Sequence, residues 1–247
     1  MPRIYLSPST QDWNPYVDGS GSEEYWMNLL ADALEPYLYA NTIAFVRNSP
    51  EMTAASSIAQ ANQLGGFDFY LALHSNASGE GQAGKNRGII VFYYPTSSDG
   101  KRAAELFAAQ LRMVYPLPAK VTTQATTTLG EVRRPRYPAN LIELGYHDNY
   151  DDARWIENNL DAAAQAIARG LTEYFGLPFI YPQLVRTGVV TTEGSALRLR
   201  SYPGIDGETV GSIPNGESVQ VYGSYQGWYS VGYDGQLGYA AQAYIAV

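Results

Sequence analysis

The chain has 247 residues, which is enough for one sizeable core and a small additional module. Its formal net charge of −8 argues against a nucleic-acid partner, because phosphate binding needs a basic face. Cysteine is absent, which excludes disulfides and cysteine zinc sites, and no run of 18 apolar residues predicts insertion into a membrane.

The N-terminal part opens with a short strand at residues 3–6, and no signal peptide is predicted ahead of it. Residues 11–22 are polar and contain several glycine and proline residues, so we expect a loop there. A helix should follow, with Ser22 as its cap and apolar residues at helical spacing as far as Tyr37.

The next segments repeat this alternation of strand and helix. Residues 42–46 predict a strand, and the alanine-rich stretch 52–64 predicts a helix that stops at two glycines. The apolar run 69–73 predicts a buried strand that ends at His74. The glycine-rich stretch 78–87 then predicts a mobile loop at the rim of the sheet.

The pattern continues with a strand at 88–94, a helix at 101–114, a strand at 140–144 and a single helix at 153–175. Units of about 30 residues that each hold one strand and one helix are typical of βα repeats. The sequence therefore predicts an α/β fold, with a mostly parallel sheet that carries helices on both faces.

Two of these predicted strands end in residues that carry chemistry. Glu143 lies inside an apolar strand, where an unpartnered carboxylate would cost several kcal/mol, so it should meet a metal, a cation or a proton-transfer task. His74 ends another buried strand, and His147 is the only other histidine. Open α/β sheets build their sites where strands end, so we expect these residues to form one site.

The same stretches resemble a known family. Leu73-His-Ser-Asn-Ala77 resembles the Ile-His-Ala-Asn-Ala signature of zinc-dependent N-acetylmuramoyl-L-alanine amidases. The segment 138–146 is similar to the family's Pro-Ala-Val-Leu-Val-Glu-x-Gly-Phe motif, and the likeness runs over about the first 178 residues. It implies Zn²⁺ held by His, Glu and His, with His74 as the second histidine and Glu143 as the glutamate that moves a proton.

The resemblance also implies a glutamate ligand four residues before an asparagine, at the start of the first helix. Glu24 with Asn28 reproduces this spacing, so Glu24 is the expected metal ligand and Glu23 is kept as the alternative. Without the resemblance, both acids read as ordinary first-turn residues that the helix dipole favours.

The chain departs from the family pattern at the first histidine, where it has Thr10, a poor zinc ligand. His147 is the expected substitute. An extended chain would carry it about 13 Å beyond Glu143, but a turn at Gly145 could fold it back over the site. Gln11 and Asp12 are the alternative third ligands, and His147 could instead be a loop residue that hydrogen-bonds nearby groups.

Substrate contacts are predicted at two further positions. Three arginines gather ahead of the Glu143 strand, and we expect Arg133 to bind an anionic group of the substrate. The alternative is that these arginines neutralise nearby acids. Asn76, within the first family signature, is the second expected substrate-binding residue.

The C-terminal part changes character. Residues 179–186 read as a linker between a catalytic domain at 1–178 and a β domain at 187–247, whose short alternating strands are separated by glycine and proline turns. Segments such as 197–203 and 213–216 resemble bacterial SH3-like domains, which implies a wall-binding role. Trp228 is a candidate wall contact, although we expect it in the barrel core.

The sequence thus predicts a peptidoglycan hydrolase that uses zinc-activated water to cleave the amide between N-acetylmuramic acid and L-alanine. The expected partner is peptidoglycan, and the expected place of action is the extracellular cell wall, in an autolysin or an endolysin. Because of Thr10, the alternative is a non-catalytic wall-binding protein with a degenerate amidase domain. A zinc carboxypeptidase that acts on stem peptides would use the same chemistry and differ only in its products.

Overall fold

The computed structural model describes residues 1–247 and divides them into two compact units. The α/β unit comprises Arg3–Leu34 and Phe45–Tyr174. The β unit comprises Met1–Pro2, Glu35–Ala44 and Phe175–Val247. The segment Glu35–Ala44 was expected in the catalytic domain but groups with the C-terminal residues, and the predicted boundaries at 178 and 187 stay predictions.

The α/β unit is built on a six-stranded sheet with the order β2-β1-β3-β6-β4-β5. Neighbours β1, β3 and β6 run parallel, whereas β4 runs antiparallel to β6 and parallel to β5. The mostly parallel α/β sheet is confirmed. The strands are β1 (Arg3–Pro8), β2 (Ala44–Arg47), β3 (Phe69–Asn76), β4 (Ile89–Tyr93), β5 (Val121–Ala125) and β6 (Ala139–Tyr146).

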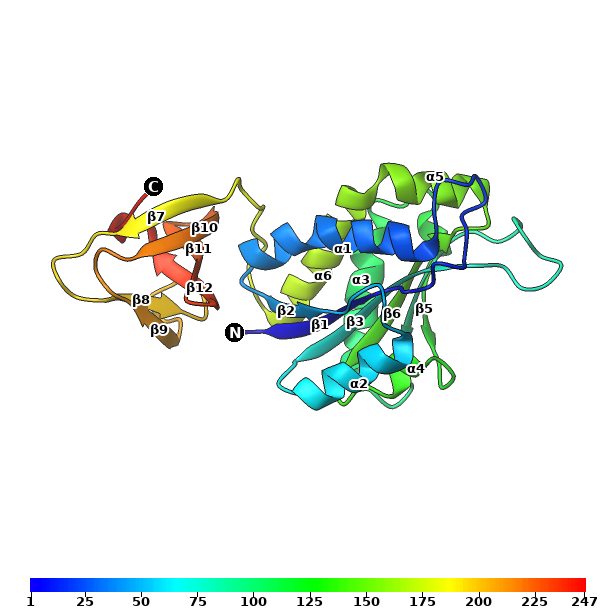
Figure 1. Ribbon diagram of the computed structural model, residues 1–247, viewed down its shortest axis with the longest axis horizontal. Helices are drawn as coiled ribbons and strands as arrows, with labels where there is room; N and C mark the ends of the chain where they lie inside the picture. The colour runs from blue at the N-terminus through cyan, green and yellow to red at the C-terminus, as the bar shows by residue number, and fades with distance from the viewer. The chain divides into compact units, whose positions relative to one another are not determined.

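Helices cover both faces of this sheet, with α2 and α4 on one face and α1, α3 and α6 on the other (Figure 1). Ser22 caps α1 as predicted, because its hydroxyl accepts a hydrogen bond from the Tyr25 amide. No helix combines the length and apolar character needed to cross a membrane. The helices are α1 (Glu23–Ala40), α2 (Ala54–Leu64), α3 (Ser98–Arg112), η1 (Pro118–Lys120), α4 (Gly130–Arg133), α5 (Tyr150–Asn158) and α6 (Leu160–Phe175).

Two segments differ from the sequence prediction. The single helix predicted over 153–175 is two helices, because Asn159 leaves the helical conformation (φ −133°, ψ 24°) and its side chain donates to the carbonyl of Trp155. The polar stretch 122–136, for which no element was predicted, contains most of strand β5 and all of the short helix α4. Helix α4 carries Glu131.

The hydrophobic core under α2 and α4 also contains polar groups, which are the hydroxyls of two buried tyrosines. It combines aliphatic residues with Tyr5 and Tyr70, whose rings stack at 5.2 Å between centroids. The two hydroxyls reach different partners, Gln60 for Tyr5 and Glu131 for Tyr70. Buried tyrosines need such partners for their hydroxyl groups, so this core is tied to the polar residues at the strand ends.

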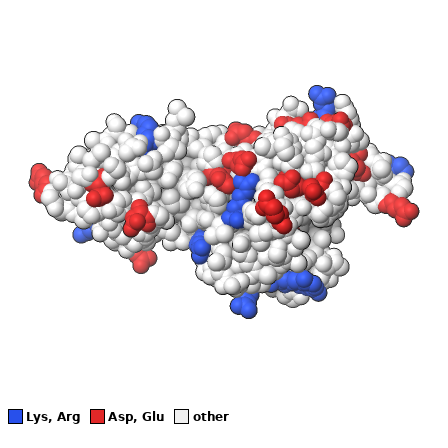
Figure 2. Space-filling model, viewed as in Figure 1, with Lys and Arg blue, Asp and Glu red and all other residues white.

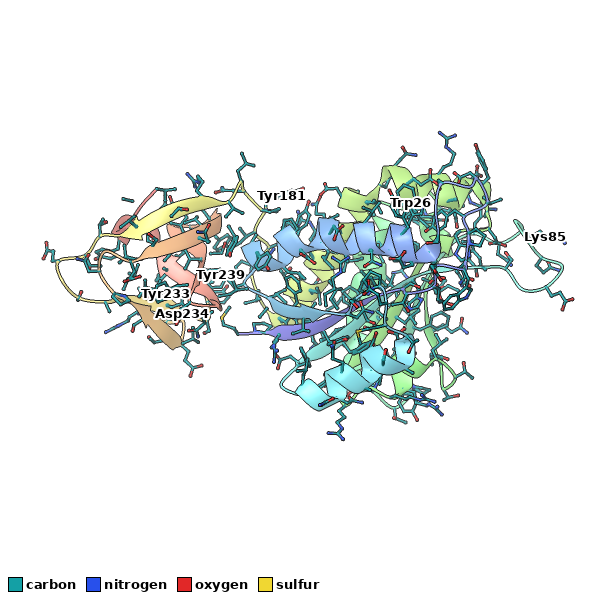
Figure 3. The ribbon with its side chains drawn as sticks, viewed as in Figure 1. Trp26, Lys85, Tyr181, Tyr233, Asp234 and Tyr239 are labelled. Atoms are coloured by element: carbon teal, nitrogen blue, oxygen red, sulfur yellow. The ribbon has the colours of Figure 1, made fainter.

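The β unit contains an antiparallel seven-stranded sheet with the order β13-β7-β10-β11-β12-β8-β9. Its main core is apolar, and Trp228 lies outside it in a second cluster with Tyr239, so the expectation of a barrel-core tryptophan is wrong. Asp234 and Gly235, both with positive φ, form the two-residue turn after Tyr233 (Figure 3). The elements are β7 (Arg186–Val190), β8 (Leu197–Arg200), β9 (Thr209–Ile213), β10 (Ser218–Tyr225), β11 (Trp228–Tyr233), β12 (Gln236–Ala241), η2 (Gln242–Tyr244) and β13 (Ile245–Ala246).

Charged side chains are scattered over the surface in small groups. On the face shown in Figure 2, lysine and arginine form only separate patches among more numerous acidic side chains.

Candidate functional site

The site is centred on His74, which lies near the C-terminal end of β3 and is 8% exposed. Both ring nitrogens are engaged by carboxylates. Nδ1 lies 2.7 Å from Glu23 Oε1, and Nε2 lies 2.9 Å from Glu131 Oε2. Glu23 begins helix α1 and Glu131 is in α4, so elements from both faces of the sheet meet at this histidine.

Glu131 is held firmly by two hydroxyl groups. Its Oε1 accepts hydrogen bonds from Ser7 at 2.6 Å and from Tyr70 at 2.7 Å, while Oε2 faces His74. The residue is 4% exposed. A buried carboxylate with both oxygens engaged has its charge well compensated and its orientation fixed.

On the other side of the ring, Glu23 shares its oxygens with the loop after β1. Gln11 Nε2 lies 3.3 Å from Glu23 Oε1 and 3.4 Å from His74 Nδ1. Asn14 donates to Glu23 Oε2 at 2.8 Å and to Gln11 Oε1 at 3.3 Å. The side chains of Gln11 and Glu23 therefore both lie beside His74 Nδ1.

These partners change the acidity of both groups. Burial alone lowers the pKa of His74, but hydrogen bonds to Glu131 and Glu23 outweigh it and hold that pKa well above its usual value. Burial raises the pKa of Glu23, and the hydrogen bond and charge of His74 outweigh it, so the Glu23 pKa is lowered. The two neighbouring carboxyl groups thus favour the protonated form of the imidazole.

Glu143 occupies the neighbouring position on β6, where its Cα is paired in register with that of His74. Its Oε2 is buried and has no hydrogen-bond partner. Burial raises the pKa of Glu143 to about 7, against an opposing effect of the His74 charge. A carboxyl group that titrates near neutral pH can both accept and donate a proton.

A pocket of about 300 Å³ opens over these groups. Its wall includes Thr10, His74, Glu131 and Glu143, together with Trp13, which is 67% exposed. The reactive groups are therefore accessible from one side and buried on the other. An exposed aromatic ring at such a pocket suits stacking against a sugar ring.

The structure brings together only part of the expected metal set. His74 is at the centre, but the carboxylate that contacts it belongs to Glu23, while Glu24 accepts a hydrogen bond from Asn28. Helix α1 begins at Glu23. The geometry thus favours Glu23, the alternative residue, over Glu24.

His147 is not placed with His74. Its Nδ1 lies 2.9 Å from the carbonyl oxygen of Ser75 and its ring stacks on Tyr16. Side chains alternate along a strand, so Ser75 and its neighbour His74 point to opposite faces of the sheet. The chain reversal expected at Gly145 is wrong, because β6 continues through Gly145 (φ +141°) to Tyr146 with only a register irregularity, which leaves His147 packed against Ser75.

Neither of the expected substrate-binding residues lines the pocket. Arg133 is exposed at the end of α4, two residues after Glu131. Asn76 ends β3, and its carbonyl accepts the His147 amide. Both remain predictions. Of the alternative third ligands, Gln11 reaches His74 Nδ1, and Asp12 is exposed in the adjoining turn.

Sequence reasoning missed Glu131. The signal was available, because this acid lies between Leu129 and Val132 as Glu143 lies within an apolar strand. The partner of Glu131 comes from β3, 57 residues away, and no local pattern predicts that contact.

Whether this site can hold a divalent cation depends on which side of His74 is considered. No three histidine, aspartate or glutamate side chains surround a common position, because Glu23 and Glu131 contact opposite ring nitrogens. On the Nδ1 side, however, Glu23, His74 and Gln11 lie within 3.4 Å of one another. His74 and Glu23 are residue types that bind zinc, but Gln11 presents its amide NH₂ group to this position while its Oε1 accepts from Asn14, so a third ligand atom would require rotation of the Gln11 amide.

Comparison with known proteins agrees with this fold. The sequence profile of the N-acetylmuramoyl-L-alanine amidases matches residues 16–173, and that of bacterial SH3 domains matches residues 195–246. No curated protein sequence matches the chain.

Three solved structures illustrate the likeness. An amidase from Clostridium difficile 630 is 18% identical with a TM-score of 0.62, and AmiC2 of Nostoc punctiforme is 17% identical with a TM-score of 0.61; each comparison covers 71% of this chain and 97% of the other. The catalytic domain of CwlV from Bacillus (Paenibacillus) polymyxa var. colistinus is 20% identical with a TM-score of 0.58, covering 71% of this chain and 99% of that domain.

Proposed function

Since the chain belongs to the N-acetylmuramoyl-L-alanine amidase family, we propose that its α/β unit hydrolyses the amide between N-acetylmuramic acid and L-alanine with the help of a zinc ion. The observation that supports this most directly is the pairing of His74 with Glu143 on neighbouring strands of one pocket. One residue can help to bind a cation while the other, with a pKa of about 7, handles the proton.

We propose His74 Nδ1, Glu23 and Gln11 as the residues that would hold the zinc. Gln11 then takes the role that Thr10 cannot fill, from the next position of the same loop. Asn14 donates to Glu23 Oε2, which directs that carboxylate to this position, whereas Gln11 would have to release its Oε1 from Asn14 to offer that oxygen. A bound zinc supplies a Lewis acid that polarises the amide carbonyl and lowers the pKa of water.

Glu143 performs the proton transfer in this mechanism. As a carboxylate it takes a proton from the water that attacks the carbonyl carbon. It then delivers this proton to the nitrogen of L-alanine as the C–N bond breaks, so the products are the lactyl acid and the free stem peptide. The unpartnered Oε2 is suited to this task, because no competing hydrogen bond holds it.

Residues around the pocket would position the glycopeptide. The ring of Trp13 can stack on a sugar, and Arg133 at the end of α4 can pair with an anionic substrate group. The bacterial SH3 domain would bind the same polymer, which supports the cell wall as the proposed site of action.

The replacement of the first family histidine by Thr10 favours one alternative, a wall-binding protein without catalysis. Digestion of muropeptides distinguishes the two functions. Wild-type protein with zinc should release stem peptides that begin with L-alanine, and chelation should stop the release. No release by zinc-loaded protein would contradict the amidase function, and release of a C-terminal amino acid would indicate a carboxypeptidase.

A further inference from the structure

A second pocket lies in the β unit and has no part in the mechanism above. Its volume of about 940 Å³ is within the range of sites that bind small ligands. Its lining comes from the loop 191–196, from strand β8, from the start of β11 and from the segment 241–244 near the end of the chain. We call this pocket the β-unit groove.

Strand β8 places two arginines in the β-unit groove. Side chains alternate along a strand, so Leu197 and Leu199 belong to the apolar core, while Arg198 and Arg200 lie on the opposite face. Strands β8 and β12 pair in register only at Arg200 with Tyr239. The groove lies next to this single pair, and both arginines line it.

The positive charge of the β unit is concentrated at this groove. The unit contains no lysine and three arginines, of which Arg198 and Arg200 line the groove and Arg186 does not. Arg198 is exposed and has no ion-pair partner. Glu193 is the one acidic residue of the lining. In a chain with a net charge of −8, this local excess of cations favours an anionic ligand.

Aromatic side chains and fixed walls complete the groove. Trp228 is half-buried in the lining, and Tyr244 is 49% exposed. Arg200 donates to the carbonyl of Gly207 at 2.6 Å, which ties β8 to the loop after it. The amide of Thr191 donates to the carbonyl of Tyr244 at 2.9 Å, which joins the two ends of the lining. A preformed groove with rings and cations suits an extended anionic peptide.

We propose that the β-unit groove binds the stem peptide of peptidoglycan, with Arg198 paired to the terminal carboxylate and with Trp228 and Tyr244 packed against the peptide chain. This inference rests on the proposed function, because it specifies which part of the polymer the bacterial SH3 domain would bind. Charge favours the peptide over the glycan. In the intact polymer the lactyl carboxyl group is in amide linkage and carries no charge, whereas the peptide ends in a carboxylate.

Titration of the full-length chain with the synthetic stem peptide L-Ala-γ-D-Glu-L-Lys-D-Ala, followed by ¹H–¹⁵N NMR, tests the inference directly. The signals of Arg198, Trp228 and Tyr244 should shift together. The C-terminal amide of the same peptide should bind about 10-fold more weakly, because one charge-assisted hydrogen bond is lost. Shifts confined to the α/β unit, or equal affinity for the acid and the amide, would overturn the inference.

A pair of arginine variants locates the contact. Arg198→Gln should bind the acid about 10-fold more weakly and should no longer distinguish the acid from the amide, because both changes remove the same contact. If the two losses multiply instead, Arg198 does not contact the carboxylate and the inference is wrong. Arg186→Gln is the matched control, since it removes the arginine outside the groove, and it should bind as the wild type does.

Sedimentation with insoluble cell walls identifies the source of the anion. Glu143→Gln protein, chosen to limit digestion, should bind walls from which phosphate polymers have been removed as well as it binds untreated walls. Walls without stem peptides should not bind it. Binding that depends on the phosphate polymers, or that survives removal of the peptides, would contradict the inference. Release of stem peptides by the wild-type chain reports on the amidase function separately, so either proposal can fail alone.

Discussion

The two units bury different kinds of side chain. The core of the β unit is apolar, and neither a carboxylate nor a histidine is buried in that unit. The α/β unit buries Glu23, His74 and Glu131 in one cluster. Burial of apolar side chains stabilises a fold directly. Each buried charge must instead be compensated by its own partners, so the α/β unit carries a free-energy cost that the β unit does not.

Asp152 shows that burial of a charge does not by itself mark a reactive group. This fully buried carboxylate accepts from Arg87, from Tyr115 and from the backbone amides of Gly88 and Tyr146, so all its capacity is used to hold the structure together. Glu143 differs, because its Oε2 has no partner. Glu143 thus keeps a free hydrogen-bonding position that Asp152 lacks, which supports the proton-transfer role proposed for Glu143.

The largest effect that we expect comes from Glu143→Gln. Loss of a general acid and base should lower the rate of stem-peptide release about 10²–10⁴-fold. The folded protein should lose no stability, since the amide removes a charge that is costly to bury. Glu105→Gln, at an exposed position on α3, is the control and should retain the wild-type rate. Equal rates for wild type and Glu143→Gln would remove Glu143 from the mechanism.

The adjacent glutamates of α1 provide the next test. Loss of a residue that only hydrogen-bonds a metal ligand typically weakens metal binding about 10–100-fold. Glu23→Gln should weaken zinc binding by more than this, because it removes a proposed ligand. Glu24→Gln should bind zinc as the wild type does, since Glu24 contacts Asn28. Equilibrium dialysis with metal analysis measures both. The reverse result would restore Glu24 as the ligand.

A core substitution in the β unit should change stability and leave chemistry alone. Ile213 is fully buried in its apolar core, and Ile213→Ala should lower the free energy of unfolding of this unit by about 2–5 kcal/mol. Hydrolysis of a small soluble muropeptide should continue at the wild-type rate below the melting temperature. A parallel loss of that activity would contradict the separation of roles.

The pH dependence of stability should reveal Glu143 in metal-free protein. His74, Glu23 and Glu131 face it, and burial raises its pKa from 4.5 to about 7. Between these two pH values the folded state binds one more proton than the unfolded state. The contribution of Glu143 to the free energy of unfolding is therefore fully present below pH 4.5 and is lost as the pH rises to about 7.

The difference between wild type and Glu143→Gln isolates this contribution, which should change by at most about 3 kcal/mol over that range. Denaturant unfolding in a chelating buffer measures it. Parallel pH profiles for the two proteins would show that the pKa of Glu143 is not raised.

The smallest effect should come from Trp13→Ala at the pocket. Loss of ring stacking is expected to cost about 0.5–1.5 kcal/mol, seen as a higher KM for glycan-bearing substrate with kcat retained. A substrate without the sugar ring should not distinguish the variant from the wild type. A fall in kcat with unchanged KM would contradict the stacking role.

Much of the fold could be predicted from the sequence, because local patterns determine it. Apolar runs gave β3 and β6, and Ser22 and Thr53 provide caps that accept amide hydrogen bonds at the starts of α1 and α2. The short helix α4 was missed because its four residues carry no helical period. The break at Asn159 was missed because helical spacing continues on both sides of it.

The site was only partly predictable, because its contacts join distant segments. The apolar strands predicted that His74 and Glu143 carry the chemistry. The choice between Glu23 and Glu24 depends on the rotation of α1 at its first turn, which spacing along the chain does not determine. The contact of Glu131 with His74 depends on how α4 packs below β3, and the position of His147 depends on the irregularity at Gly145.

Anomalous diffraction at the zinc absorption edge, from crystals of the zinc-loaded chain, tests the central claim most directly. The account predicts one strong peak bonded to His74 Nδ1 and Glu23, with the Glu143 carboxylate beside it and Glu131 on the far side of the ring. An empty pocket, or a peak held by His147 instead, would contradict it.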